Sequence, residues 1–338
     1  MKNFYKRTFE ISSFENLVIS VFVIGYRNIG ESILVLFRDT SNDTVIMSML
    51  VDSYEKEGLN VIKKVLSRYR VDKLDFVCWT HPHCDHSSGI DSIINEMFHD
   101  DMVIFSPKFY YGNLAEDLLA NESAKTPDIY ENIWNIIEKH PNIAEIWRTI
   151  SAYGDATHSY KMQFLTKDGV YHKDVNLYFL TPLSHKIDRF ATKGNQFRKP
   201  NELSVSFVMS VDGYDFFFGG DTENDHADGI CDDIVHEMRW IKVPHHCSLG
   251  AKSIADRLGP KFDYAASTVF KSANLPKKEV QNVYAAAGAL HMTQLDENES
   301  YSPTYDYGII QYDYHFSHCE TIVDIITYGN AGQYFIKA

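Results

Sequence analysis

The stretch His81-Pro82-His83-Cys84-Asp85-His86 places three imidazole rings and one carboxylate within six residues. Imidazole nitrogens and carboxylate oxygens are ligands that zinc, manganese and iron accept in proteins. Alternate side chains of an extended segment point the same way, so His81 and His83 can reach one ion. A tighter turn after them lets Asp85 and His86 reach a second ion. The stretch therefore predicts a metal site.

The surrounding chain alternates between apolar runs and turns, which predicts an α/β protein with two sheets covered on their outer faces by helices. Residues 100–150, with isoleucines at helical spacing, are expected to form a helical insertion that could cover the site. No linker divides the chain, so residues 1–338 are expected to be one domain. The predicted strands are 17–24, 32–37, 45–51, 74–79, 175–180, 203–211, 214–218, 240–243, 307–314 and 321–328, and the predicted helices are 59–66, 90–97 and 278–289.

Composition limits the classes of protein to consider. The chain has 338 residues, of which 44% are hydrophobic and 23% charged, as in a globular protein with a proper core. No apolar run approaches about 18 residues, so no transmembrane helix and no membrane partner are expected. Five scattered cysteines indicate reduced thiols and a cytoplasmic location. A formal charge of −14 argues against broad binding to a nucleic-acid backbone.

Two later strand ends carry further ligand types. Asp221 follows the apolar run 216–218 and two glycines, and His246 follows the run 240–243 and Pro244. A carboxylate at a rigid strand end has two oxygens and can bridge two cations. The nitrogen of His246 can complete the second cation site.

With these motifs the sequence resembles the metallo-β-lactamase fold superfamily, over roughly residues 15 to 330. The resemblance implies a four-layer αββα sandwich whose metal ligands lie at strand ends along one edge. The HxHxDH motif of the superfamily stands here at residues 81–86, its "GD" motif at 220–221, and its late "GH" motif at 245–246. The implied metal ligands are His81, His83, Asp85, His86, Asp221 and His246.

Within the superfamily, the chain is most similar to stand-alone relatives of the hydrolase domain of competence protein ComEC. Those relatives often read "GDSILI", "HPHxDHxxG", "NxxS", "GD" and "HHGS" in this order. The matching segments here are 30–35, 81–89, 201–204, 220–221 and 245–248, with Glu31 in place of the first aspartate and Cys247 in place of the last glycine.

The departures from the family pattern bear on the first cation. Asn201 stands where hydrolases of the superfamily place a third histidine, and an amide oxygen is a poor ligand beside imidazole. The first site is therefore expected to be the weaker one, with Asn201, His245 and Ser248 as weak ligands or outer partners. Histidines elsewhere could fill the gap, namely His158, His172 or His185. Cys247 either packs in the core or acts as a soft outer ligand, and Leu275 replaces a histidine of those relatives.

The resemblance implies a metal-dependent hydrolase. One or two Zn²⁺ ions, with Mn²⁺ or Fe²⁺ as alternatives, would lower the pKa of a bound water toward neutrality and make hydroxide available. Asp85 would then act as both ligand and orienter of the nucleophile. Fold alone does not choose the substrate. The readings left open are a phosphodiesterase or nuclease, a hydrolase of an ester, lactone or amide, and a metal-binding interaction protein whose chemistry has decayed.

A basic run beside Asn201 favours the phosphodiesterase reading. It includes Arg189, Lys193, Arg198 and Lys199, which could contact substrate phosphate oxygens. With an acidic protein around this run, a small nucleotide or a single-stranded nucleic acid is the expected substrate. The sequence does not indicate the oligomeric state.

Overall fold

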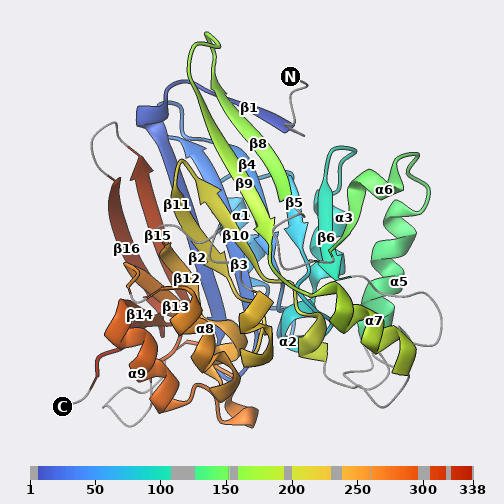
Figure 1. Cartoon of the computed structure of the whole chain (residues 1–338). Helices are drawn as coiled ribbons and strands as arrows, with labels where there is room; N and C mark the ends of the chain where they lie inside the picture. Colours follow the sequence, from blue (N-terminus) through green and yellow to red (C-terminus); the bar gives the residue numbers. More distant parts are fainter. Residues whose placement is uncertain are drawn as a thin grey trace.

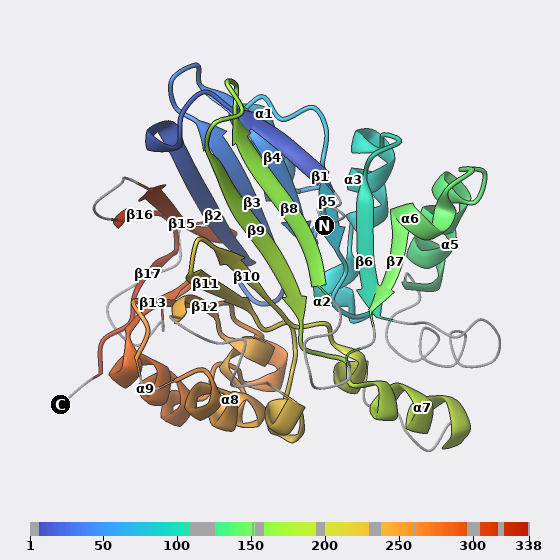
Figure 2. The same cartoon turned by 45° about the horizontal axis from the view of Figure 1, so that its top comes forward.

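The computed structural model describes residues 7–107, 126–150, 152, 159–193, 200–229, 238–259, 261–295, 305–316 and 321–336. Within these ranges, the strands form two large sheets that face each other, and helices lie outside both sheets (Figures 1 and 2). Among the described residues, no helix has the length and apolar character that crossing a bilayer requires.

In the described part of the chain, the first sheet has eight strands. From β4 to β7 the neighbours run parallel, whereas the strands from β16 to β4 are antiparallel. The predicted hairpin near the carboxyl end therefore joins the strands near the amino end. In spatial order the strands are β16 (Thr321–Gly329), β15 (Tyr307–Phe316), β2 (Leu17–Tyr26), β3 (Glu31–Asp39), β4 (Thr44–Val51), β5 (Phe76–Cys78), β6 (Val103–Pro107) and β7 (Trp147–Ile150).

The second sheet has nine strands within the described ranges. Those from β11 to β14 run parallel, as do β1 and β8, and the other neighbours are antiparallel. The spatial order is β1 (Arg7–Ile11), β8 (Ser159–Thr166), β9 (His172–Phe179), β10 (Phe207–Val211), β11 (Tyr214–Phe218), β12 (Met238–Lys242), β13 (Tyr264–Ser267), β14 (Ala289–Met292) and β17 (Gly332–Gln333).

The main core lies between the two sheets. Every residue of β2 is buried, because successive side chains of a strand point to opposite faces and both faces of this sheet are covered. Ile19, Val21 and Val23 belong to the core between the sheets. Phe22 and Ile24 point the other way, into a second core beneath the helices. This explains why the strand reads as a continuous apolar run rather than an alternating one.

Helices complete the outer layers. The outer face of the eight-stranded sheet packs against α1 (Val61–Arg68), α3 (Ile90–Met97) and α5 (Thr126–Ile137). The outer face of the nine-stranded sheet packs against α8 (Lys252–Arg257) and α9 (Lys278–Ala287). The predicted αββα sandwich is therefore confirmed, and Figure 2 shows α8 and α9 on one side with α3 and α5 across the molecule.

Residues 100–150, expected to form a helical insertion, contain both helices and strands. Helices α5 and α6 (Ile143–Ile146) lie between strands β6 and β7, which extend the eight-stranded sheet. Ile129, Ile133 and Ile137 of α5 are buried in the core on the outer face of that sheet, because their spacing forms one apolar stripe. Residues 108–125 lie outside the described residues.

The parallel strands of both sheets end at one common edge of the sandwich. Each sheet contains a block of parallel strands, β4–β7 in one and β11–β14 in the other. The loops after β5 and β12 lead into the short helix α2 (Cys84–Ser87) and the turn before α8, which lie together at the lower end of the sandwich in Figure 1. This is the edge on which the sequence places its metal ligands.

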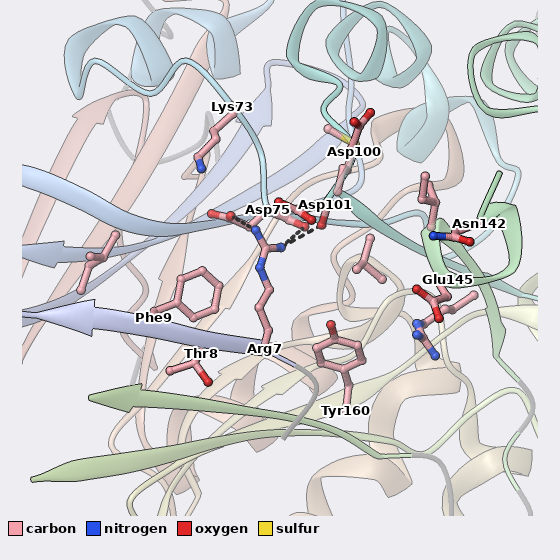
Figure 3. Close-up of a pocket in the computed structure, with 15 residues that line it drawn as sticks. Arg7, Thr8, Phe9, Lys73, Asp75, Asp100, Asp101, Asn142, Glu145 and Tyr160 are labelled. Atoms are coloured by element: carbon pink, nitrogen blue, oxygen red, sulfur yellow. Dashed lines mark hydrogen bonds and ion pairs between the residues drawn. The ribbon is translucent and has the colours of Figure 1, made fainter. Parts of the chain in front are cut away.

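At the opposite edge, Arg7 ties the two sheets together. Its guanidinium, on β1, donates to Asp75 Oδ1 at 2.6 Å and to the Asp101 carbonyl oxygen at 3.0 Å (Figure 3). The other oxygen of Asp75 accepts a hydrogen bond from the backbone N–H of Ser48 at 2.9 Å. Because Asp75 precedes β5 of the eight-stranded sheet, this buried carboxylate joins three segments from both sheets.

We predict that Asp75→Ala destabilises the protein by about 2–4 kcal/mol, since it leaves Arg7 and the Ser48 N–H without their buried partner. Urea unfolding of the two proteins measures the difference. Asp100→Ala is the matched control, because that side chain lines the same cavity but is 89% exposed. If Asp75→Ala lowers the free energy of unfolding no more than Asp100→Ala does, the hydrogen bonds of Asp75 are not important for stability.

Candidate metal centre

The loops that follow four strands supply the centre. Asp52 directly follows β4, and residues 81–86 follow β5. In the other sheet, Asp221 follows β11, and residues 245–246 follow β12. All of the six predicted ligands are described, and they lie close together where the two sheets meet.

The histidine-rich loop is held by hydrogen bonds around α2. His83 precedes the first residue of α2 with an extended backbone, so its ring stays outside the helix while Asp85 and His86 lie within it. Trp79 Nε1 donates to Ser87 Oγ at 2.9 Å, and that hydroxyl donates to the His83 carbonyl oxygen at 2.7 Å. The loop is thereby fixed to the buried end of β5.

The first ligand cluster consists of His81, His83 and Asp221. Their ligand atoms all lie within 4.8 Å of one another. His81 Nε2 is 2.9 Å from His83 Nδ1 and 3.4 Å from Asp221 Oδ2, and His83 Nδ1 is 3.9 Å from the same oxygen. These separations fit three ligands around one ion, since atoms at ~2.1 Å from a tetrahedral ion stand about 3.4 Å apart.

A second cluster shares the other oxygen of Asp221. His86 Nε2 is 3.3 Å from Asp221 Oδ1 and 3.5 Å from Asp85 Oδ2. His246 Nε2 is 2.9 Å from Asp85 Oδ2 and 3.8 Å from Asp221 Oδ1. The Oδ2 atom of Asp221 thus faces one group of imidazoles and its Oδ1 atom faces the other, a geometry that suits a carboxylate shared by two cations.

Asp52 orients two of these rings. Its Oδ2 atom lies 2.7 Å from His86 Nδ1 and accepts a hydrogen bond from the Thr80 hydroxyl at 2.6 Å. The same hydroxyl oxygen is 2.9 Å from His81 Nδ1. Because the hydroxyl donates to Asp52, it accepts from His81 Nδ1–H. Both rings therefore carry a proton on Nδ1 and turn Nε2 toward the clusters, where it is the ligand atom of the neutral imidazole.

A second chain of hydrogen bonds, or relay, runs through a threonine hydroxyl to a carboxylate and orients His246, as the chain through Thr80 to Asp52 orients His81. His246 Nδ1 lies 2.8 Å from the Thr268 hydroxyl, which donates to Glu31 Oε2 at 2.6 Å. Glu31 is itself paired with the Lys242 ammonium at 2.6 Å, and both side chains are fully buried. Burial opposes ionisation of Glu31, but Lys242 and the nearby histidines lower its pKa. The relay therefore ends in a charged, compensated carboxylate.

The electrostatics of the centre are those of crowded, buried carboxylates. Burial, with His86 beside it, lowers the pKa of His81 to about 3, so this ring is neutral. Burial disfavours ionised Asp221, yet His86 and His81 hold its pKa well below its usual range. Burial would lower the pKa of His86, but Asp221, Asp85 and Asp52 raise it well above its usual value.

These features fit a divalent cation. Buried charges are stable only when they are paired or coordinate a metal. Asp221 Oδ1 is buried and accepts no hydrogen bond, although it faces the rings of His86 and His246. Neutral imidazole nitrogens and carboxylate oxygens with outer hydrogen-bond partners are what such an ion requires. The residues of both clusters therefore fit a metal site.

Two of the remaining predicted partners, Asn201 and Ser248, contact His245. Asn201, in the 3₁₀ turn before β10, donates from Nδ2 to Glu223 Oε1 at 3.3 Å and lies 3.3 Å from His245 Nε2. Ser248 Oγ is 3.0 Å from His245 Nδ1. Cys247 is buried in the core, where burial raises the pKa of its thiol. It therefore packs in that core and belongs to neither ligand cluster.

Other predicted contacts are not part of the described centre. His172 and His185 are exposed and belong to neither cluster, and His158 lies outside the described residues. Arg198 and Lys199 also lie outside them, and the side chains of Arg189 and Lys193 are not described. The proposed phosphate contacts therefore stay predictions.

A large cavity lies away from the metal centre. It has a volume of about 840 Å³, and its lining includes Arg7, Asp101, Glu145 and Arg148 (Figure 3). The cavity borders the beginning of β5, whereas the ligands follow the end of that strand. Among the described residues that line it, none is a predicted ligand.

Comparison with known proteins gives a limited result. No family model and no curated protein matches the chain. A diphosphatase from the PhnP family is a similar solved structure, with 12% identity, a TM-score of 0.40, and coverage of 88% of this chain and 98% of that one. The Rm3 metallo-β-lactamase is another, with 14% identity, a TM-score of 0.32, and coverage of 78% and 90%. The centre is therefore interpreted from its own geometry.

Sequence reasoning missed the residues that orient the ligands. Asp52 carries the same signal as Asp221, a carboxylate directly after an apolar strand. Glu31 carries a local signal too, since this carboxylate precedes the apolar run 33–37. Thr80, Thr268 and Glu223 carry no local signal, because their role depends on which strands become neighbours.

We predict that Asp52→Asn weakens metal binding by about 10–100-fold, since the amide no longer fixes the Nδ1 protons of His81 and His86. Isothermal titration with Zn²⁺ or Mn²⁺ measures this. Asp313→Asn is the control, because that buried carboxylate bonds to Ser20 and Arg38 away from the centre. Equal affinity in wild type and Asp52→Asn would contradict the orienting role.

We also predict that metal stabilises the fold. A cation that binds only the folded state, at 100 times its dissociation constant, adds about 2.7 kcal/mol to the free energy of unfolding. This should raise the melting temperature by several degrees, and EDTA should reverse it. Thermal unfolding with and without metal measures the shift, and an unchanged melting temperature in Zn²⁺, Mn²⁺ and Fe²⁺ would argue against the site.

Proposed function

We propose that this protein is a metal-dependent hydrolase that cleaves phosphodiester bonds, with two cations held by the clusters that share Asp221. The observation that carries the proposal is this shared carboxylate, whose two oxygens face separate groups of imidazole nitrogens. Zinc or manganese suits such nitrogen and oxygen ligands. The motif order that resembles ComEC-type hydrolases supports the same class.

The cations would lower the pKa of water toward neutrality and polarise a phosphoryl oxygen. The chain's own contribution is to hold and orient the reacting groups. Burial opposes ionisation of Asp85, but His86 and His246 lower its pKa, so the carboxylate is charged and can accept a hydrogen bond that orients the attacking water. The relays through Thr80 and Thr268 keep the imidazole lone pairs directed at the clusters.

The distribution of charge along the chain supports an anionic substrate. A phosphodiester is an anion, and the basic run around Arg189, Lys193, Arg198 and Lys199, which directly precedes Asn201 in the sequence, would provide local positive charge in an otherwise acidic chain. Lys186, at the start of this run, is already paired with Asp225 at 2.7 Å. A small nucleotide or a single-stranded end therefore suits the protein better than long duplex DNA. A cytoplasmic location is part of this proposal, and among the described residues Cys78, Cys84 and Cys247 form no disulfide.

We predict that the protein loaded with Zn²⁺ or Mn²⁺ hydrolyses bis(p-nitrophenyl) phosphate, and that Asp221→Ala lowers kcat/KM by about 10³-fold or more, equivalent to ~4 kcal/mol of lost transition-state stabilisation. Release of p-nitrophenol measures both rates. His315→Ala is the control, because that histidine is exposed and paired with Asp324 on the β15–β16 hairpin.

The same assay separates the rival activities. Hydrolysis of nitrocefin or of nitrophenyl esters, without cleavage of the phosphodiester, would replace the proposal with lactam or ester hydrolysis. Metal binding without turnover of any of these substrates would favour a binding protein. Full activity in Asp221→Ala would show that the chemistry takes place elsewhere.

A further inference from the structure

A third imidazole approaches the Oδ2 atom of Asp221, from a position where the wider superfamily's "GH" motif reads glycine. His245 Nε2 lies 3.8 Å from Asp221 Oδ2, the oxygen that faces His81 and His83. The corresponding distances for those two rings are 3.4 and 3.9 Å. Three imidazole nitrogens therefore lie within 3.9 Å of one carboxylate oxygen, and two ligand atoms of a single tetrahedral ion stand about 3.4 Å apart.

On the opposite side of the His245 ring, Nδ1 has the kind of hydrogen-bond partners that orient a histidine ligand. His245 Nδ1 lies 3.0 Å from Glu223 Oε1 and 3.0 Å from Ser248 Oγ. A histidine ligand usually donates its second N–H to a carboxylate, which fixes the tautomer and makes the other nitrogen a better ligand. Glu223 does for His245 what Asp52 does for His86.

The contact with Asn201 indicates the tautomer of His245. Asn201 Nδ2 donates to Glu223 and lies 3.3 Å from His245 Nε2. An amide N–H next to Nε2 requires this nitrogen to be the acceptor, so the ring proton lies on Nδ1. The lone pair of His245 Nε2 is then directed toward Asn201 and Asp221, at the entrance to the first cluster.

Asn201 itself is poorly suited to be the missing ligand. Its amide nitrogen, which has no lone pair available for a metal, faces His245 and Glu223. Its oxygen is buried and has no hydrogen-bond partner, as for Asp221 Oδ1, so the Asn201→Ala variant below tests this oxygen as the rival ligand. Exchanging the two amide atoms would place the oxygen against the Glu223 carboxylate, so the present orientation is the favourable one.

The backbone at His245 also explains the arrangement. His245 and His246 have φ values of 45° and 49°, in the left-handed region that residues other than glycine rarely adopt. This conformation brings both rings to the same carboxylate, because each has its Nε2 atom 3.8 Å from one oxygen of Asp221. Strain of this kind persists where the surrounding contacts require it, often at functional sites.

We propose that His245, oriented by Glu223 and Ser248, supplies the third imidazole of the first cation site in place of Asn201. The proposal rests on the metal-dependent function proposed above and extends it to the identity of a ligand. It makes the first site a site with three histidines and one aspartate, rather than the weak site expected from Asn201.

Metal content and affinity test this directly, without an activity assay. Wild type and variants are stripped of metal, loaded with Co²⁺, and examined by elemental analysis, titration calorimetry and the Co²⁺ absorption spectrum. The variants are His245→Ala, Glu223→Gln, Asn201→Ala and the double variant Asn201→His with His245→Ala. His315→Ala is the matched histidine control, and circular dichroism of each metal-free protein establishes folding.

The wild type should bind two ions and His245→Ala only one, with a loss of affinity at the first site greater than about 100-fold and a changed Co²⁺ spectrum. Glu223→Gln should weaken that site by about 10–100-fold, as loss of an outer partner does. Asn201→Ala should retain two ions. The double variant should regain the second ion, because a histidine returns to the position that the family uses.

The outcomes separate this proposal from the proposed function. Two ions in His245→Ala, bound as tightly as in wild type, would overturn the role of His245 and leave the hydrolase intact. Loss of an ion in Asn201→Ala but not in His245→Ala would identify Asn201 as the ligand and also overturn it. A wild type that binds no Co²⁺, Zn²⁺ or Mn²⁺ would overturn the metal-dependent function itself.

Discussion

The structure depends most on the burial of like charges at the junction of its two sheets. Asp52, Asp85 and Asp221 have relative exposures of 0%, 1% and 2%. Three such carboxylates repel one another and lose their hydration, so the cluster is stable only with positive charge among them. His86, beside all three, gains a proton readily for this reason. A divalent cation satisfies the same requirement while leaving the imidazole rings neutral.

This requirement links the fold to the site. His81, His83, Asp85 and His86 come from the eight-stranded sheet, whereas Asp221 and His246 come from the nine-stranded sheet. The relay to His246 also crosses the junction, because Glu31 begins β3 while Thr268 follows β13. The packing of one sheet on the other thus sets the distance between ligands, and a bound ion would in turn hold the sheets together. Metal binding and stability are therefore coupled.

Local sequence patterns were enough to predict the candidate metal ligands that directly follow strands. The histidine-rich stretch, the carboxylate of Asp221 and His246 each follow a recognisable apolar strand, and their convergence follows from the common edge of parallel strands. Strands β6 and β7 were not predicted, because they lie within the segment whose isoleucine spacing suggested helices. The roles of Thr80 and Thr268 were also missed, since a hydroxyl acts as a relay only when a particular carboxylate becomes its neighbour.

The turn after β12 shows why a motif alone misassigns ligands. A strand presents successive side chains on opposite faces, so a reading of the pair at 245–246 assigns only one ring to the site. The left-handed backbone at His245 and His246 breaks this alternation, at a cost of about 1–2 kcal/mol per residue. The cost is offset when both rings meet the same buried carboxylate, which is the arrangement around Asp221. A chain with asparagine at 201 can thus keep a full set of imidazoles at its first cluster, because the backbone conformation, rather than the motif residue, determines which histidines face the ion.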